Sequence, residues 1–156
     1  MTSLQSREDL IEHGDLSALI CVDEPNLQYI SIDQFSQLSF GIHTALNASE
    51  ISSKIRGRVY EVIVVYERFG GSDAQTNVAL SIISELPLAQ RRETYVILVG
   101  PNMVSRSDMQ AFMYSVDLTL KDTDAGNMKV IAGRGLVRQE ELYTTFLSVW
   151  KALKAA

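Results

Sequence analysis

The sequence is poor in the residues on which many enzyme sites are built. Its 156 residues include one cysteine, Cys21, and two histidines, His13 and His43. A single cysteine excludes an internal disulfide framework and a cysteine-based zinc site within the chain. The two histidines are far apart in the sequence and have no ligand pattern around them, so neither indicates a catalytic base. We therefore expect no catalytic residue, no metal ion and no cofactor.

The chain also lacks a basic excess and any long apolar segment. Its formal net charge is -5, whereas a nucleic-acid-binding surface needs a basic field. No apolar run approaches the roughly 18 residues that indicate a membrane span. The N-terminal stretch "MTSLQSREDLIEH" is polar and acidic, without the apolar core of a signal peptide. These features predict a cytoplasmic protein that binds no nucleic acid and has no membrane span.

Short apolar runs alternate with amphipathic ones along the chain. Five runs are typical of buried strands, because each is short, apolar and bounded by turn residues. They lie at residues 16–23, 42–46, 59–67, 94–100 and 117–121. Apolar residues recur at helical spacing at residues 25–40, 47–58, 73–86 and 105–116, and again from about residue 124 onward. This alternation predicts one α/β domain over residues 16–156, with a parallel sheet covered on both faces, after an N-terminal extension of residues 1–15.

The C-terminal segment carries two further predictions. Gly133 and Gly135 are expected to bend or break its helix, because glycine destabilises a helix interior. Tyr143 and Trp150, seven residues apart, lie on the flank of the apolar stripe of this helix, where such a pair can anchor a partner. The stripe itself, expected to cover one edge of the sheet, consists of Leu142, Phe146, Val149 and Leu153.

Several predicted strands end in polar or small residues. Ligands and catalytic groups gather at the carboxyl ends of the strands in open α/β sheets. The residues at these ends are Asp23 and Glu24 after the first strand, Tyr66 and Glu67 after the third, Gly100 after the fourth and Lys121 after the fifth.

Three stretches resemble a two-component receiver domain, in the order in which a receiver presents them: "ALICVDEPNLQ", "GIHTALNASEISSKIRGRVYEVIVVYERFGG" and "SVDLTLKDTD". The resemblance implies a flavodoxin-like, doubly wound fold of five parallel strands in the order 2-1-3-4-5. "ELPLAQRRETYVILVG", "DMQAFMYSVDLTL" and "EELYTTF" are similar to an uncharacterised bacterial family of receiver-like domains. That family is sometimes attached to a zinc ribbon, which this sequence does not contain.

The resemblance also implies roles for the residues at the strand ends. Receivers hold Mg²⁺ with two acidic residues after the first strand, here Asp23 and Glu24, with Val22 as the alternative for one of them. The position of the phospho-acceptor aspartate falls on Tyr66. A phenol is neutral at pH 7 and is a weak ligand for a hard cation. The switch hydroxyl after the fourth strand falls on Gly100, which has no side chain.

We therefore expect a degenerate receiver pocket that has lost the phosphorylation chemistry. Lys121 matches the receiver lysine but has no phosphoryl group to neutralise. One alternative is a phosphorylatable receiver that uses Glu67 or Asp73 as a non-standard acceptor, although Glu67 should face the opposite side of the strand from Tyr66. A second alternative is a nucleotide- or metal-binding protein built on the strand-end loops. The predicted pocket consists of Asp23, Glu24, Tyr66, Glu67, Gly100 and Lys121.

The helix expected at residues 105–116 has more apolar surface than one packed face needs. Methionine and aromatic residues are enriched at interfaces, and receivers dimerise and dock through their fourth helix, fifth strand and fifth helix. Arg91 and Arg92 are interpreted as a solvated helix end, with an acidic partner or phosphate as the alternative. The sequence thus predicts a non-catalytic protein-interaction module, either a homodimer or an accessory subunit of a bacterial assembly, that binds through its last and fourth helices. The predicted surface consists of Met109, Phe112, Met113, Tyr114, Tyr143 and Trp150.

Overall fold

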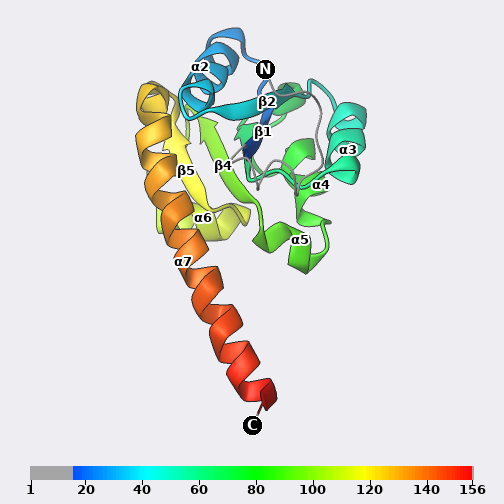
Figure 1. Ribbon diagram of the computed structural model, residues 1–156. Helices are drawn as coiled ribbons and strands as arrows, with labels where there is room; N and C mark the ends of the chain where they lie inside the picture. Colours follow the sequence, from blue (N-terminus) through cyan, green and yellow to red (C-terminus); the bar gives the residue numbers. More distant parts are fainter. Residues whose placement is uncertain (1–15, 156) are drawn as a thin grey trace.

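A five-stranded parallel sheet forms the centre of the molecule (Figure 1). The computed structural model of the chain describes residues 16–155, apart from the side chains of residues 142–147, 150 and 155. The strands are β1 (Leu16–Cys21), β2 (Phe40–Thr44), β3 (Val62–Tyr66), β4 (Tyr95–Gly100) and β5 (Leu118–Lys121). Their order is β2-β1-β3-β4-β5, and every neighbouring pair is parallel. This arrangement confirms the flavodoxin-like fold predicted above.

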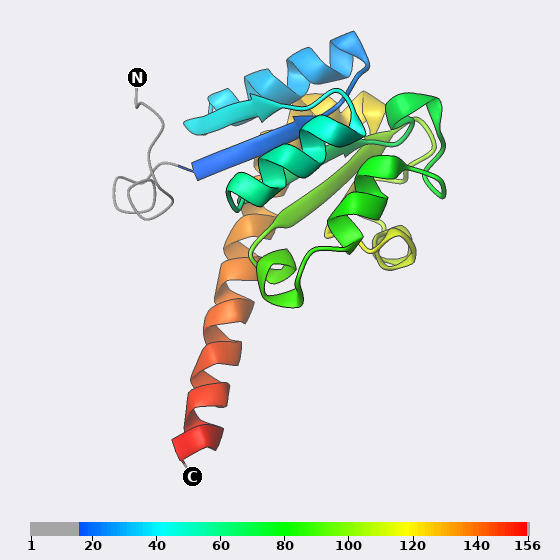
Figure 2. The same cartoon turned by 90° about the vertical axis from the view of Figure 1, so that its right-hand side faces the viewer.

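Helices cover both faces of the sheet, which explains why the central strands are almost uniformly apolar. On one face, α2 and α7 contribute Phe35, Met128 and Ala132 to a buried cluster. On the other face, α3 and α4 contribute Ile51 and Ile83 to a second cluster. Figure 1 shows the two layers on either side of the sheet, and in Figure 2 the layer of α3 and α4 faces the viewer. The helices are α2 (Pro25–Ser36), α3 (Ala48–Gly57), α4 (Val78–Ser84), α5 (Leu88–Arg92), α6 (Asp108–Tyr114) and α7 (Met128–Ala155), with 3₁₀ helices η1 (Phe69–Gly71) and η2 (Asp122–Asn127).

The helix predicted at residues 73–86 is shorter than expected and is followed by a second one. The chain first forms a turn around Asp73, and α4 begins only after Asn77. The Asn77 side chain accepts hydrogen bonds from the amides of Ala79 and Leu80, as a helix cap does. Pro87 ends α4 as predicted, but the chain then forms the short helix α5.

The prediction that Gly133 and Gly135 bend or break the last helix is wrong, because α7 runs without interruption from Met128 to Ala155. Gly135 lowers the stability of the helix itself, and the packing of α7 explains why a glycine is present there. A Cβ atom built at Gly135 would collide with the phenol of Tyr95, so only a glycine lets the helix lie this close to β4. Gly133 has open space around it.

The far part of α7 does not cover the edge of the sheet, contrary to the prediction for its apolar stripe. A helix of 28 residues is about 42 Å long at 1.5 Å per residue, whereas the six residues of β4 span only about 20 Å. Residues from the first turns of α7, such as Met128 and Ala132, therefore cover the sheet. The rest of the helix projects away from it (Figures 1 and 2), and Val149 and Leu153 are exposed.

Two predictions concern the ends of the chain and the membrane. The N-terminal extension of residues 1–15, which includes His13, lies outside the described residues. Among the helices that the structure describes, none has the length and apolar character that crossing a membrane would require.

Candidate degenerate receiver pocket

Tyr66 lies at the end of β3, the position that the resemblance assigns to the phospho-acceptor. Its ring is half-buried and packs against the clusters on both faces of the sheet. Burial is the main cause that raises the pKa of the Tyr66 phenol, and the carboxylates of Glu24 and Asp23 act in the same direction, against Arg68. The phenol is therefore neutral near pH 7 and offers no charged oxygen to a cation or a phosphoryl donor.

The two acidic residues after β1 each have a structural hydrogen bond. Asp23 accepts a hydrogen bond of 2.9 Å from the amide of Gly70, which attaches the end of β1 to the loop after β3. Glu24 is the N-cap of α2 and accepts a hydrogen bond of 2.7 Å from the amide of Leu27. An N-terminal carboxylate is also favoured by the helix dipole. Both carboxylates therefore contribute to the local structure of the loop and the helix.

Lys121 is the last residue of β5, opposite Gly100 in the register of the two strands. Its ammonium group donates a hydrogen bond of 3.3 Å to the backbone carbonyl of Pro101. Within residues 16–155, Lys121 forms no ion pair with Asp23 or Glu24. The structure thus brings the six predicted pocket residues to one edge of the sheet, but it does not connect the lysine to the carboxylates.

Glu67 and Gly100 are in direct contact. The Glu67 side chain is 3% exposed, and its two oxygens accept hydrogen bonds of 2.9 Å and 2.8 Å from the backbone amide and the side-chain amide of Asn102. A Cβ atom built at Gly100 would collide with the Glu67 side chain. Glu67 therefore fills the space beside the strand end that the resemblance assigns to the switch hydroxyl, and the absence of a side chain at residue 100 accommodates it.

Asn77 is a residue of this region that the sequence analysis missed. Its side-chain amide donates hydrogen bonds of 2.8 Å and 3.1 Å to the carbonyls of Tyr66 and Glu67. Because the same side chain also caps α4, it fixes the end of β3 to the start of that helix. An asparagine directly before an apolar helical run is the signal that would have identified the cap.

Asp73, the other alternative acceptor, lies in the exposed turn before α4. One of its carboxylate oxygens accepts hydrogen bonds from the amides of Gln75 and Thr76 and from the Thr76 hydroxyl. The hydrogen bonds from Thr76 lower the pKa of Asp73. In the part of the chain that the structure describes, no group of three or more His, Cys, Asp or Glu residues is arranged to hold a metal ion.

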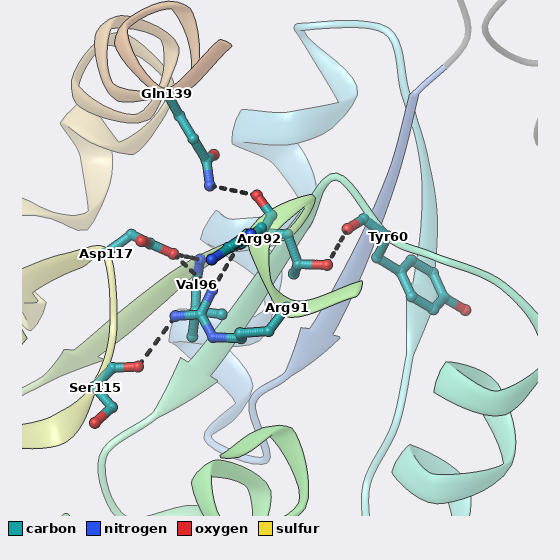
Figure 3. Close-up of polar contacts among 8 residues, drawn as sticks. Tyr60, Arg91, Arg92, Val96, Ser115, Asp117 and Gln139 are labelled. Atoms are coloured by element: carbon teal, nitrogen blue, oxygen red, sulfur yellow. Dashed lines mark hydrogen bonds and ion pairs between the residues drawn. The ribbon is translucent and has the colours of Figure 1, made fainter. Parts of the chain in front are cut away.

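Arg91 is interpreted above as part of a solvated helix end. In the structure it forms a cluster at the N-terminal ends of β4 and β5, away from the predicted pocket (Figure 3). Its guanidinium pairs with Asp117 at 3.1 Å and donates hydrogen bonds to the carbonyls of Thr94 and Ser115. Asp117 also accepts a hydrogen bond of 2.8 Å from the amide of Val96. The planar fork of an arginine suits this set of acceptors, so Arg91 joins α5 to two strand ends.

The predicted interaction residues are divided between two places. On α6, Met109, Phe112 and Met113 are exposed, whereas Tyr114 is half-buried and packs against the cluster beneath α4. Tyr143 and Trp150 belong to the projecting part of α7, and their side chains lie outside the described residues.

Comparisons with known proteins agree with this architecture. No protein-family model matches the chain, and no curated protein sequence matches it. Among solved structures, a Chloroflexus aurantiacus protein provisionally named a response regulator aligns with a TM-score of 0.64 and 11% identity, over 79% of this chain and 98% of its own.

Two further solved structures have the same fold. A Burkholderia pseudomallei response regulator, solved with a phosphorylated aspartic acid and a calcium ion, aligns with a TM-score of 0.60 and 16% identity, over 84% of this chain and 72% of its own. The signal receiver domain of a Pseudomonas fluorescens HD domain-containing protein aligns with a TM-score of 0.59 and 14% identity, over 92% of this chain and 97% of its own. The chain therefore has the receiver fold of response regulators.

Proposed function

We propose that this chain is a non-catalytic, receiver-like protein-interaction module, which acts as a homodimer or as an accessory subunit of a bacterial assembly. The observation that carries the proposal is the apolar face of α6. Met109, Phe112 and Met113 are 72%, 86% and 60% exposed. A cluster of large exposed apolar side chains on one short helix is typical of an interaction site, and methionine and phenylalanine are enriched at such sites.

The far part of α7 supports the same proposal. It projects from the domain (Figures 1 and 2), and its described apolar residues Val149 and Leu153 are exposed. Tyr143 and Trp150 are spaced seven residues apart on this helix, so they share one side of it. An aromatic pair on a projecting helix can insert into a complementary pocket of a partner.

The pocket at the strand ends supports the loss of phosphoryl-transfer chemistry. Tyr66 presents a neutral phenol at the acceptor position, and Glu67 fills the space beside Gly100. The two alternative acceptors are less favourable, because their carboxylates already have hydrogen-bond donors. Asn102 binds both oxygens of the buried Glu67 carboxylate, and Thr76 binds one oxygen of the Asp73 carboxylate. A nucleophilic carboxylate must be free to approach the phosphorus atom.

The proposal is tested by measuring assembly. We expect the double variant Tyr143→Ala/Trp150→Ala, and separately Met109→Ala/Phe112→Ala, to lower the oligomeric mass in light scattering or to lose partners in a pull-down, with an unchanged circular dichroism spectrum. Tyr29→Ala/Leu88→Ala is the matched control, because both residues are exposed on other helices. An unchanged mass together with unchanged partners in both test variants would refute the proposal.

A further inference from the structure

A groove of about 600 Å³ runs between α6 and the first half of α7, over β5. Tyr95, Leu118 and Thr119 lie in it, and α7 contributes Ile131 and Gly135 to its wall. The collision that any side chain at Gly135 would make with Tyr95 shows how closely α7 approaches this part of the sheet. The groove lies beside the apolar face of α6, so a partner that covers Phe112 also lies within reach of it.

Three arginines line this groove: Arg106 before α6, and Arg134 and Arg138 on α7. Arg134 and Arg138 are four residues apart and therefore share one face of the helix. Within the described residues, the three guanidinium groups form no hydrogen bond or ion pair, and all three side chains are exposed. This contrasts with Arg91, whose guanidinium has three acceptors, on Asp117, Thr94 and Ser115.

Two acidic residues also line the groove, but they do not neutralise it. The Asp117 carboxylate is already bound by Arg91 and by the amide of Val96. Asp108 remains as one negative charge beside three positive ones. The whole chain has a formal net charge of -5, so the groove is a local basic surface on an acidic protein.

The backbone at Arg106 adds an independent observation. Its φ angle is 57°, in the left-handed region that residues other than glycine, asparagine and aspartate adopt at a cost. The conformation is held by β5: the Arg106 amide donates a hydrogen bond of 2.8 Å to the Thr119 carbonyl, and the Ser107 amide donates one of 3.1 Å to the Thr119 hydroxyl. Backbone strain of this kind is concentrated at functional sites.

We infer that this groove binds a carboxylate-rich segment of a protein partner, whose acidic groups pair with Arg106, Arg134 and Arg138 while its apolar side chains cover Phe112. The inference rests on the proposed function, since it takes the α6 side of the molecule as the interaction surface. Arginine forks match carboxylates in geometry, and pairing three unpaired guanidiniums gives the partner its orientation.

A protein segment fits the groove better than a nucleic acid does. A nucleic acid presents a continuous row of phosphates and needs a broad basic field, whereas this basic surface is confined to one groove of an acidic chain. The exposed methionine and phenylalanine residues beside the groove also require apolar groups on the partner, which a peptide provides and a phosphate backbone does not.

The test uses the whole chain and a fluorescein-labelled peptide in which pairs of glutamates are separated by leucines. The control is the same peptide with every glutamate replaced by glutamine, which has the same shape but no charge. In fluorescence anisotropy at low salt, we expect the glutamate peptide to bind at least about tenfold more tightly than the glutamine peptide, and added salt to weaken it. The double variant Arg134→Glu/Arg138→Glu should lose about tenfold or more of this affinity. The charge-matched control Lys54→Glu/Arg56→Glu, on α3, should bind within about twofold of the wild type, because it lies outside the groove.

The location is checked by backbone amide chemical shifts, which should move at Ser107, Thr119 and Gly135 when the peptide binds. Equal affinity for the two peptides, an equal loss in the two double variants, or equally tight binding of a labelled oligothymidylate would overturn the inference. These failures are distinguishable from failure of the proposed function. A chain that ignores the acidic peptide but still loses assembly in Tyr143→Ala/Trp150→Ala remains an interaction module, with a partner of other chemistry.

Discussion

The buried side chain of Glu67 occupies the space that any side chain at Gly100 would need. The two residues lie at the ends of neighbouring parallel strands, and Asn102 binds both oxygens of the glutamate. The strand end that the resemblance assigns to a switch hydroxyl is thus occupied by a carboxylate that Asn102 binds. A pocket filled in this way favours one conformation of the loop between β4 and α6.

This contact predicts that Gly100→Ala destabilises the protein by about 1–3 kcal/mol in urea unfolding, because the added methyl group overpacks a buried site. The cost should fall when Glu67 is also replaced by glycine, since the colliding Cβ, Cδ and Oε1 atoms are then removed. Gly57→Ala is the control, because a Cβ atom at Gly57 meets nothing within 4 Å. Additive effects in the double variant Glu67→Gly/Gly100→Ala would show that the two positions do not compete for space.

The identity of the acceptor residue gives a second prediction. Incubation of the wild-type chain with Mg²⁺ and acetyl phosphate should leave its intact mass unchanged, because Tyr66 offers a neutral phenol in place of a carboxylate. Tyr66→Asp, treated in parallel, shows whether the rest of the pocket can still support the reaction. A mass gain of one phosphoryl group on the wild type, removed by Glu67→Gln or Asp73→Asn, would instead establish the alternative of a non-standard acceptor.

The two glycines of α7 provide a third prediction, in which the same substitution has opposite effects. Gly133→Ala should stabilise the protein by up to about 1 kcal/mol, because the site is open and alanine is the better helix former. Gly135→Ala should destabilise it by about 1–3 kcal/mol, because the new methyl group collides with the Tyr95 ring. The measurement is the urea unfolding midpoint of each variant at constant slope. Effects of the same sign would contradict the packing role assigned to Gly135.

These sites show what the sequence could and could not predict. The apolar runs were sufficient to place the five strands, because a central parallel strand is buried on both faces and contains little else. The alternation of strand side chains also predicts Glu67 on the opposite side of the strand from Tyr66. What Glu67 does there depends on Asn102, which is brought to it only by the register of β3 and β4. The role of Gly135 similarly depends on Tyr95, forty residues earlier in the sequence, so its local helix propensity predicted a break that does not occur.

The prediction that the apolar stripe of α7 covers the edge of the sheet was wrong for a different reason. Helical spacing of apolar residues predicts that a face is buried, but it does not identify what buries it. In this fold the sheet ends before the helix does, so the stripe of the far part of α7 has no sheet to cover. The same pattern that was assigned to the core therefore becomes part of the proposed interaction surface.

The contact between His43 and Tyr60 carries the last prediction. The His43 Nδ1 atom lies 2.7 Å from the Tyr60 hydroxyl, and the two rings meet edge to face. Burial is the main cause that lowers the pKa of His43 from its ordinary value of 6.5, and the positive charges of Arg58 and Lys54 lower it further. The folded state therefore favours the neutral imidazole, which can accept the hydrogen bond of the phenol.

Because the pKa of His43 is lower in the folded state, the unfolded chain binds more protons just below pH 6.5, and the free energy of unfolding must fall as the pH decreases through that range. At higher pH both states hold a neutral imidazole, so this contribution is constant there. We expect His43→Gln to reduce the pH dependence of the urea midpoint between about pH 7 and pH 5.5, since glutamine does not titrate. His13→Gln, which removes the other histidine, is measured in parallel so that the two contributions are separated. If His43→Gln keeps the full wild-type slope, other groups control acid stability and the half-buried histidine does not.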